Sequence, residues 1–142
     1  MKRSDALRSL SRDHHKALSV ALDLRRAQDV GQASARFLEF WSDGAVHFRI
    51  EEEVLLPHWE LLGTVSAEAV ARLTGEHRTL RAAALEVSAG TATLASLRDL
   101  GATLAAHVRF EERELFPMIE ADLGEHQLET LARVVAEAEV NH

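Results

Sequence analysis

The stretch HFRIEEEVLLPHWE (47–60) decides the fold, because HVRFEERELFPMIE (107–120) repeats it with identical residues at seven of fourteen positions. Both copies begin with His-x-x-x-Glu. Residues four apart on an α-helix share a face and lie about 6 Å apart along the axis. Each stretch, read as a helix, therefore presents one imidazole and one carboxylate together, which is a pair of metal ligands.

A second repeat precedes each copy of this stretch. Leu10 lies four residues before His14, as Leu73 lies four before His77, and an acidic residue directly precedes each histidine. The halves are offset by 63 residues here and by 60 residues in the longer stretch. The sequence therefore indicates a helical hairpin that is present twice.

The composition favours helices. In 142 residues Ala, Leu, Glu and Arg dominate, Tyr is absent and Pro occurs twice. Helix formers at this level, with few residues typical of strands, predict an all-α fold. The length is that of a single domain, covering residues 1–142, and is sufficient for a real core.

Charge and cysteine content exclude several classes of function. Because the chain has no Cys, it has no disulfide, thiolate metal site or Cys nucleophile, and any metal must use nitrogen and oxygen ligands. The net charge of −7, with acidic and basic residues interspersed, argues against a nucleic-acid partner. No apolar run reaches the length of a membrane helix or signal peptide. We therefore expect a soluble, cytoplasmic protein with no membrane partner.

Breaks in the helical pattern divide the chain into four long helices and a shorter fifth. Ser4 and Ser66 are predicted N-caps, and Pro57 either ends the second helix or starts a further short turn. Short linkers predict antiparallel neighbours. The first helix is expected at about 5–28, with Gly31 beyond its end, and the second at about 33–56. The third should run from the cap at Ser66 to about residue 89, and the fourth from about residue 93 to either 117 or 122. The shorter fifth helix is expected at 125–139.

Six titratable side chains occupy positions on the apolar stripes of these helices where a bundle normally has Leu. Burying ionised carboxylates there costs several kcal/mol unless they are paired or bind a metal. At about 1.5 Å per residue, all six lie about 14 to 22 Å from the same end of their helices and could form one layer. They are His14, His47, Glu51, His77, His107 and Glu111.

Four imidazoles and two carboxylates can hold two metal ions. Each ion would take two histidines terminally, with Glu51 and Glu111 bridging and exogenous ligands completing the coordination. Imidazole and carboxylate without thiolate suit iron or manganese, and zinc or copper also accept such ligands. The sequence therefore predicts a site for two metal ions, with iron or manganese as the metals that suit its ligands best.

The other histidines and glutamates lack this pattern. His15 adjoins His14 but breaks the match with the second half, so we place it next to the ligands or at the surface. Glu52 and Glu53 are predicted to lie on a solvated face. Three further histidines are predicted at the surface: His58, His126 and His142.

At these residues the chain resembles the hemerythrin-like proteins of the HHE cation-binding type. The resemblance spans nearly the whole chain, through RDHHKAL (12–18), HFRIEEEVLLP (47–57), GEHRTLR (75–81) and HVRFEERELFP (107–117). It implies an up-and-down four-helix bundle with an oxo- or hydroxo-bridged di-iron centre. The ligand positions that it implies are the same six residues.

One position departs from the oxygen carriers of that family, which place a second histidine four residues after the one on the third helix. Here that position is Arg81. The site is therefore more similar to di-iron repair proteins for iron–sulfur centres, and to iron- or oxygen-sensing domains. The repair proteins commonly add an N-terminal domain that contains Cys, which this chain lacks.

Three functions follow as hypotheses. The first is a di-iron protein that reacts with or senses O₂, NO or peroxide, or handles iron under oxidative or nitrosative stress, with O₂ or NO as its small diatomic ligand. The second is a reversible O₂-binding hemerythrin, which Arg81 disfavours. The third is a metal-stabilised module that binds a partner protein through a surface such as the last helix.

Overall fold

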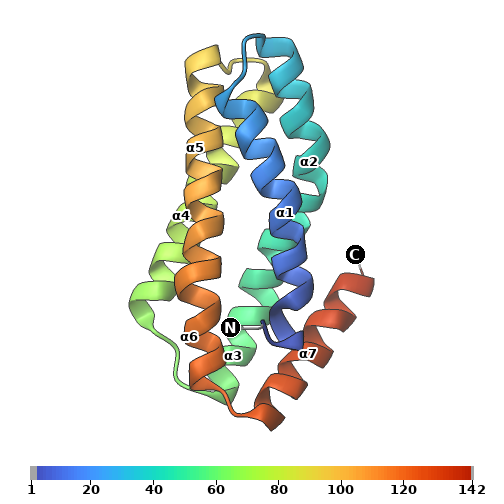
Figure 1. The fold of residues 1–142 in the computed structure, drawn as a ribbon, viewed down its shortest axis with the longest axis vertical. Helices are drawn as coiled ribbons and strands as arrows, with labels where there is room; N and C mark the ends of the chain where they lie inside the picture. Colours follow the sequence, from blue (N-terminus) through green and yellow to red (C-terminus); the bar gives the residue numbers. More distant parts are fainter. Residues whose placement is uncertain (1–2, 142) are drawn as a thin grey trace.

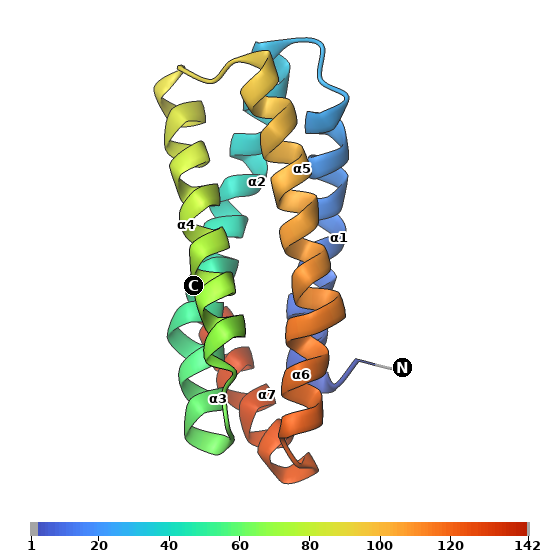
Figure 2. The ribbon, with the colours of Figure 1, turned by 90° about the vertical axis from the view of Figure 1, so that its left-hand side faces the viewer.

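A computed structural model describes residues 3–141 of the chain, and within that range every regular element is a helix. The all-α prediction is therefore confirmed. Figures 1 and 2 show long helices side by side, with the loops after α1 and α4 at one end of the bundle and α3 and α6 at the other. The helices are α1 (Asp5–Arg25), α2 (Val30–Ile50), α3 (Leu56–Leu62), α4 (Ala67–Ala89), α5 (Leu94–Phe110), α6 (Phe116–Asp122) and α7 (Glu125–Val140).

Side-chain caps set several helix ends. The Ser66 hydroxyl accepts from the Ala69 N–H at 3.1 Å, as predicted for the start of α4. Gly90, with φ at 77°, ends that helix in the left-handed conformation that glycine adopts without strain. A reciprocal pair of bonds between Thr93 and Ser96 starts α5.

The predicted junction between the first two helices is wrong by three residues on each side. The Asp29 carboxylate accepts from the Gln32 N–H at 2.8 Å, which starts α2 at Val30 and places Gly31 in its first turn. On the other side, the Arg98 guanidinium on α5 donates to the Ala27 carbonyl at 2.7 and 2.9 Å. This contact keeps the residues after Arg25 out of the helical conformation. Sequence periodicity cannot reveal it, because Arg98 lies on another helix.

Two short π-helical segments join α2 to α3 and α5 to α6: Glu51–Leu55 and Glu111–Leu115. In each, the first residue after the segment donates its N–H to the carbonyl of the glutamate five residues earlier. Pro57 and Pro117 follow, in the first turns of α3 and α6, and the helices continue past both. Of the predicted alternatives, the structure shows a further short helix after Pro57 and a continuation to Asp122.

The apolar core consists of two clusters, one on each side of the predicted metal layer. On α1 the first cluster includes Ala17 and the second Leu10, with His14 between them. The first also holds Phe37, Phe40, Phe48, Leu97 and Leu104, and the second Leu55, Trp59, Leu73, Leu115 and Phe116, together with Leu131 and Val135 of α7. The layer is therefore enclosed by apolar side chains along the bundle axis.

Helices α1 and α5 approach closely at Gly101. A Cβ atom there would lie 2.6 Å from the Ala21 carbonyl oxygen and 2.9 Å from the Arg25 nitrogen. Both neighbouring atoms belong to the backbone and cannot rotate away. The glycine therefore sets the spacing between α1 and α5, which carry His14 and His107.

A helix crosses a bilayer only if it is both long enough and sufficiently apolar. None of the helices between residues 3 and 141 combines the length and the apolar character needed to cross a membrane.

Candidate metal centre

The six predicted residues meet in the interior: the histidines come from α1, α2, α4 and α5, and the glutamates from the two π-helical segments. Each is at most 7% exposed, and Glu51, His77 and Glu111 have no exposure. Their nitrogen and oxygen atoms form two groups of four residues, in each of which the ligand atoms lie within 4.8 Å of one another. One group has His14 and His47, the other has His77 and His107, and Glu51 and Glu111 belong to both.

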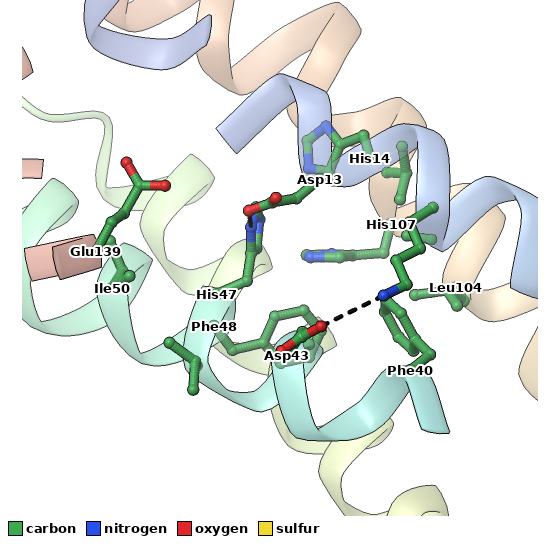
Figure 3. A pocket seen from close by; sticks show the side chains of 15 residues that line it. Asp13, His14, Phe40, Asp43, His47, Phe48, Ile50, Leu104, His107 and Glu139 are labelled. Atoms are coloured by element: carbon green, nitrogen blue, oxygen red, sulfur yellow. Dashed lines mark hydrogen bonds and ion pairs between the residues drawn. The ribbon is translucent and has the colours of Figure 1, made fainter. Parts of the chain in front are cut away.

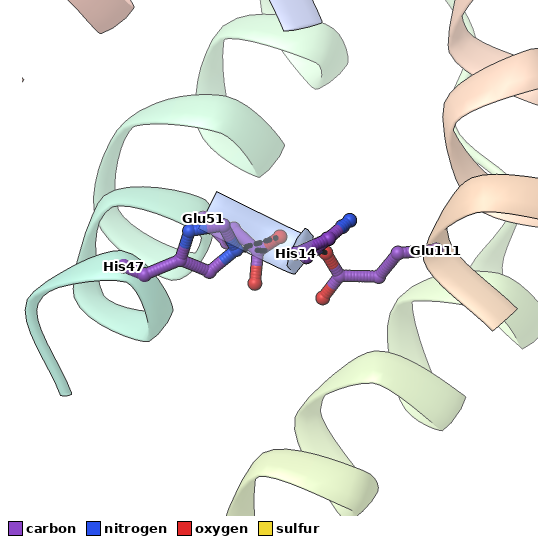
Figure 4. A group of neighbouring side chains, drawn as sticks. All are labelled: His14, His47, Glu51 and Glu111. Carbon is purple, nitrogen blue, oxygen red and sulfur yellow. Dashed lines mark hydrogen bonds and ion pairs between the residues drawn. The ribbon is translucent and has the colours of Figure 1, made fainter. Parts of the chain in front are cut away.

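The four Nε2 atoms face the two shared carboxylates. Glu111 lies 2.8 Å from His14 Nε2 through Oε1 and 2.7 Å from His107 Nε2 through Oε2. Glu51 lies 3.2 Å from His47 Nε2 and 3.1 Å from His77 Nε2. Figure 4 shows His14, His47 and the two glutamates converging. Each carboxylate therefore reaches a histidine of both groups, as bridging ligands must.

Several of these atoms lack a hydrogen-bond partner although they are buried. They are Nε2 of His47, His77 and His107, both carboxylate oxygens of Glu51, and Oε2 of Glu111. The 2.7 Å approach between His107 and Glu111 is not aligned as a hydrogen bond. Buried polar atoms without partners are costly, and imidazole nitrogen with carboxylate oxygen suits iron or manganese. The residues present therefore fit a metal centre.

The opposite ring nitrogen of each histidine contacts a carboxylate on a neighbouring helix. The Nδ1–oxygen distances are 2.7 Å for His14 to Glu112, 3.0 Å for His47 to Asp13, 2.7 Å for His77 to Glu52 and 2.7 Å for His107 to Glu76. A neutral imidazole that donates its Nδ1–H in this way keeps its Nε2 lone pair free for a metal. These contacts fix the tautomer that a metal ligand needs.

The same four contacts follow the sequence repeat. Asp13 and Glu76 each directly precede a ligand histidine, and Glu52 and Glu112 each directly follow a ligand glutamate. Helical periodicity predicted none of these four roles, and the predicted placement of Glu52 on a solvated face is wrong, because Glu52 contacts His77. Repetition of these acidic neighbours was the available signal. Their partners could not be identified, because each lies on another helix.

The carboxylates that contact the Nδ1 atoms are called the outer carboxylates below: Asp13, Glu52, Glu76 and Glu112. Three of the four are also bonded to an arginine. Arg81 binds Glu52 through two nitrogens, at 2.8 and 2.9 Å, and Arg72 Nε lies 3.0 Å from Glu76. Arg3 lies 3.3 Å from Glu112. Asp13 has no Lys or Arg partner within residues 3–141. The two halves of the site therefore differ in their surroundings despite the repeat.

Aromatic packing also constrains the histidines. The Phe48 ring stacks on His77 with centroids 3.9 Å apart and planes 6° from parallel. Phe116 stacks on His14 at 5.5 Å and 16°. Each ring is thus held between an aromatic face and a carboxylate, which limits its rotation and preorganises its Nε2 for a ligand.

The carboxylates dominate the electrostatics of the metal-free site. Burial lowers the pKa of each imidazole, but Glu111 and Glu112 together raise the pKa of His14 to about 9, and carboxylates facing His77 raise its pKa to about 9. The charge of Glu111 raises the pKa of His107 to about 10 despite its burial. Protons therefore occupy positions at neutral pH that metal ions would take.

The remaining histidines lie away from the cluster. His15 is exposed, because it lies about 100° around the axis of α1 from the buried His14. His126 is exposed as predicted. His58 is only half-buried, with Nδ1 2.8 Å from the Val54 carbonyl, so its assignment to the surface is partly right. His142 lies outside the described residues.

Comparison with protein families gives one match that covers most of the chain. The sequence model of the hemerythrin HHE cation-binding domain matches residues 5–119. The chain belongs to this hemerythrin family. The match covers all six clustered residues and ends before α7, so the last helix lies beyond the hemerythrin match. Comparison with curated proteins and with solved structures found no match.

Adjacent histidines on α1 provide a test of the ligand assignment. We expect His14→Ala to weaken metal binding by at least tenfold, because it removes a donor atom, whereas His15→Ala leaves binding within about twofold of the parent. Metal titration of both variants measures this. Equal losses in the two variants would contradict the assignment of His14.

Proposed function

We propose that the chain is a non-haem di-iron protein in which His14 and His47 bind one ion, His77 and His107 bind the other, and Glu51 and Glu111 bridge them. The observation that carries the proposal is the pair of four-residue groups that share both glutamates. Zinc or manganese would accept the same donors. The fold that goes with this function is the up-and-down four-helix bundle of the family, with α7 as an addition.

Bound iron would supply redox chemistry towards O₂, NO or peroxide. The protein would then react with or sense these molecules, or handle iron under oxidative or nitrosative stress, in the cytoplasm. The chain itself supplies two features for this role. The apolar clusters limit water around the layer, and the carboxylates at Nδ1 orient each imidazole with its Nε2 directed inward.

Reversible oxygen carriage is the less favoured alternative because of Arg81. The Arg81 guanidinium binds both oxygens of Glu52, which in turn contacts His77 Nδ1. A guanidinium is always charged and cannot ligate a metal. At the position where the oxygen carriers have a further histidine ligand, Arg81 therefore only orients Glu52, the carboxylate that contacts His77. A metal-stabilised module with a protein partner is the remaining alternative.

Anaerobic iron loading followed by exposure to O₂ or NO tests these functions. We expect about two iron ions per chain, the number that the paired groups can accommodate. A saturated preparation that holds one zinc ion and takes up no iron would contradict the di-iron proposal.

The spectrum of the loaded protein then separates the alternatives. Irreversible change on exposure supports reaction or sensing. A colour change that reverses when the gas is removed supports a carrier. A spectrum that never changes supports a structural role for the metal.

A further inference from the structure

A cavity leads from the surface to one half of the site. It has a volume of about 360 Å³ and lies between α1 and α2, with α5 behind it. Three of the site histidines line it: His14, His47 and His107. Figure 3 shows these three rings close together, with the Asp13 carboxylate beside His47. Two further cavities, one between α3 and α4 and one at the loop between α1 and α2, have no site histidine in their walls.

The outer part of this cavity is acidic. Asp13, Asp43 and Glu139 line it together with one ammonium group, that of Lys16. Lys16 Nζ lies 3.4 Å from Asp43 Oδ2, and both side chains are more than half exposed. This pair cancels to zero charge, so Asp13 and Glu139 leave the entrance negative. A negative entrance with low-dielectric walls attracts cations and repels anions.

The inner part presents buried atoms without partners. The side chains of His47 and His107 are 8% and 2% exposed, and Nε2 of each has no hydrogen bond. Once such an Nε2 atom gives up its proton, it is a ligand for a divalent metal ion. The negative entrance and the free donors therefore favour the same kind of occupant.

The outer carboxylates at the other three histidines each have an arginine partner. Arg81, Arg72 and Arg3 neutralise the outer carboxylates of the other three histidines. Only Asp13, within the described residues, combines an exposed carboxylate with contact to a site histidine and no Lys or Arg partner. A metal ion approaching any of the other three outer carboxylates would meet a guanidinium.

We propose that this cavity is the route by which hydrated divalent metal ions enter the site, with Asp13 receiving the ion and His47 taking it next. The proposal rests on the metal-binding function above. Six waters at about 30 Å³ each occupy about 180 Å³, so an octahedral hydrated ion fits within the cavity volume. The ion loses its waters one by one to carboxylate and imidazole ligands as it moves inward.

Charge variants at the entrance test the route without altering any ligand. We expect Asp43→Asn, which leaves the Lys16 charge unopposed, to slow uptake of Co²⁺ by the metal-free protein about threefold to tenfold at low ionic strength. Lys16→Gln should accelerate uptake by a similar factor, and the double variant should return close to the parent rate. All effects should shrink at high salt, where the Debye length falls to about 3 Å. Stopped-flow absorbance measures the rate, and titration measures the number of ions bound.

A second ion pair on the same two helices provides the matched control. Arg36 Nε lies 3.0 Å from Asp23 Oδ2, away from this cavity, so Arg36→Gln and Asp23→Asn make the same charge changes elsewhere. The proposal predicts parent-like rates for both. Entrance variants whose uptake rates match these controls, or change in the opposite direction, would overturn the proposed route. If such variants still bind the full number of ions, the metal-binding function itself is not contradicted. A parent protein that binds no Co²⁺ would overturn both.

Discussion

Replacing Glu111 with alanine is expected to abolish the coupled two-metal site while leaving the helices in place. Glu111 is fully buried and lies within 4 Å of Nε2 of all four site histidines. Its removal takes one ligand from each ion, and Glu51→Ala should do the same. Helix content should remain near that of the parent, because the two apolar clusters hold the helices from both sides.

The measurement is iron content together with the spectroscopic signature of coupled ions, with circular dichroism as the check on folding. Glu53→Ala is the matched control, since Glu53 lies in the same π-helical segment as Glu51 but is exposed. We expect about two ions per chain in this control and no coupled pair in either bridging variant. A bridging variant that retains a coupled pair at parent affinity would rule out the bridging roles.

Removing the metal is expected to lower the melting temperature by roughly 10 to 20 °C at pH 7.5. A ligand that binds only the folded state stabilises it by about 4 kcal/mol at a thousandfold excess over its Kd. In a domain of this size 1 kcal/mol corresponds to roughly 3 to 5 °C. A bound metal also gives a partner to the buried nitrogen and oxygen atoms of the site that have no hydrogen bond.

The pH dependence of this difference follows from the raised imidazole pKa values. In the metal-free protein the pKa of His14 and His77 is about 9 and that of His107 about 10, above the ordinary value of 6.5. Their contribution to metal-free stability is therefore complete below about pH 6.5 and lost as pH rises through 9 to 10. Metal needs neutral imidazoles, so its contribution changes in the opposite direction and is lost as pH falls.

Melting curves of metal-free and iron-loaded protein at pH 5, 7.5 and 9 measure both trends. We expect the gap between the two forms to widen with pH and to be small at pH 5. Loading at pH 7.5 should also release about four protons per chain, which a pH indicator in weak buffer detects. Identical curves at every pH would mean that the cluster is not a metal site coupled to folding.

The sequence alone determined the composition of the inner site. Helical periodicity places residues four apart on one face, so two copies of His-x-x-x-Glu and two further histidines on apolar stripes were sufficient to predict six buried residues in one layer. The predicted cap at Ser66 and the predicted end at about residue 89 likewise match both ends of α4. These features depend on neighbours within one helix, and local spacing specifies them.

Only the tertiary structure decided what surrounds that layer. Asp13, Glu52, Glu76 and Glu112 each contact a histidine 25 to 98 residues away, on a different helix. Such pairs depend on the rotation and axial offset of packed helices, which side-chain packing between helices sets and sequence periodicity leaves open. The same packing leaves Asp13 beside an open cavity with no Lys or Arg partner within residues 3–141, whereas arginines contact the other three carboxylates.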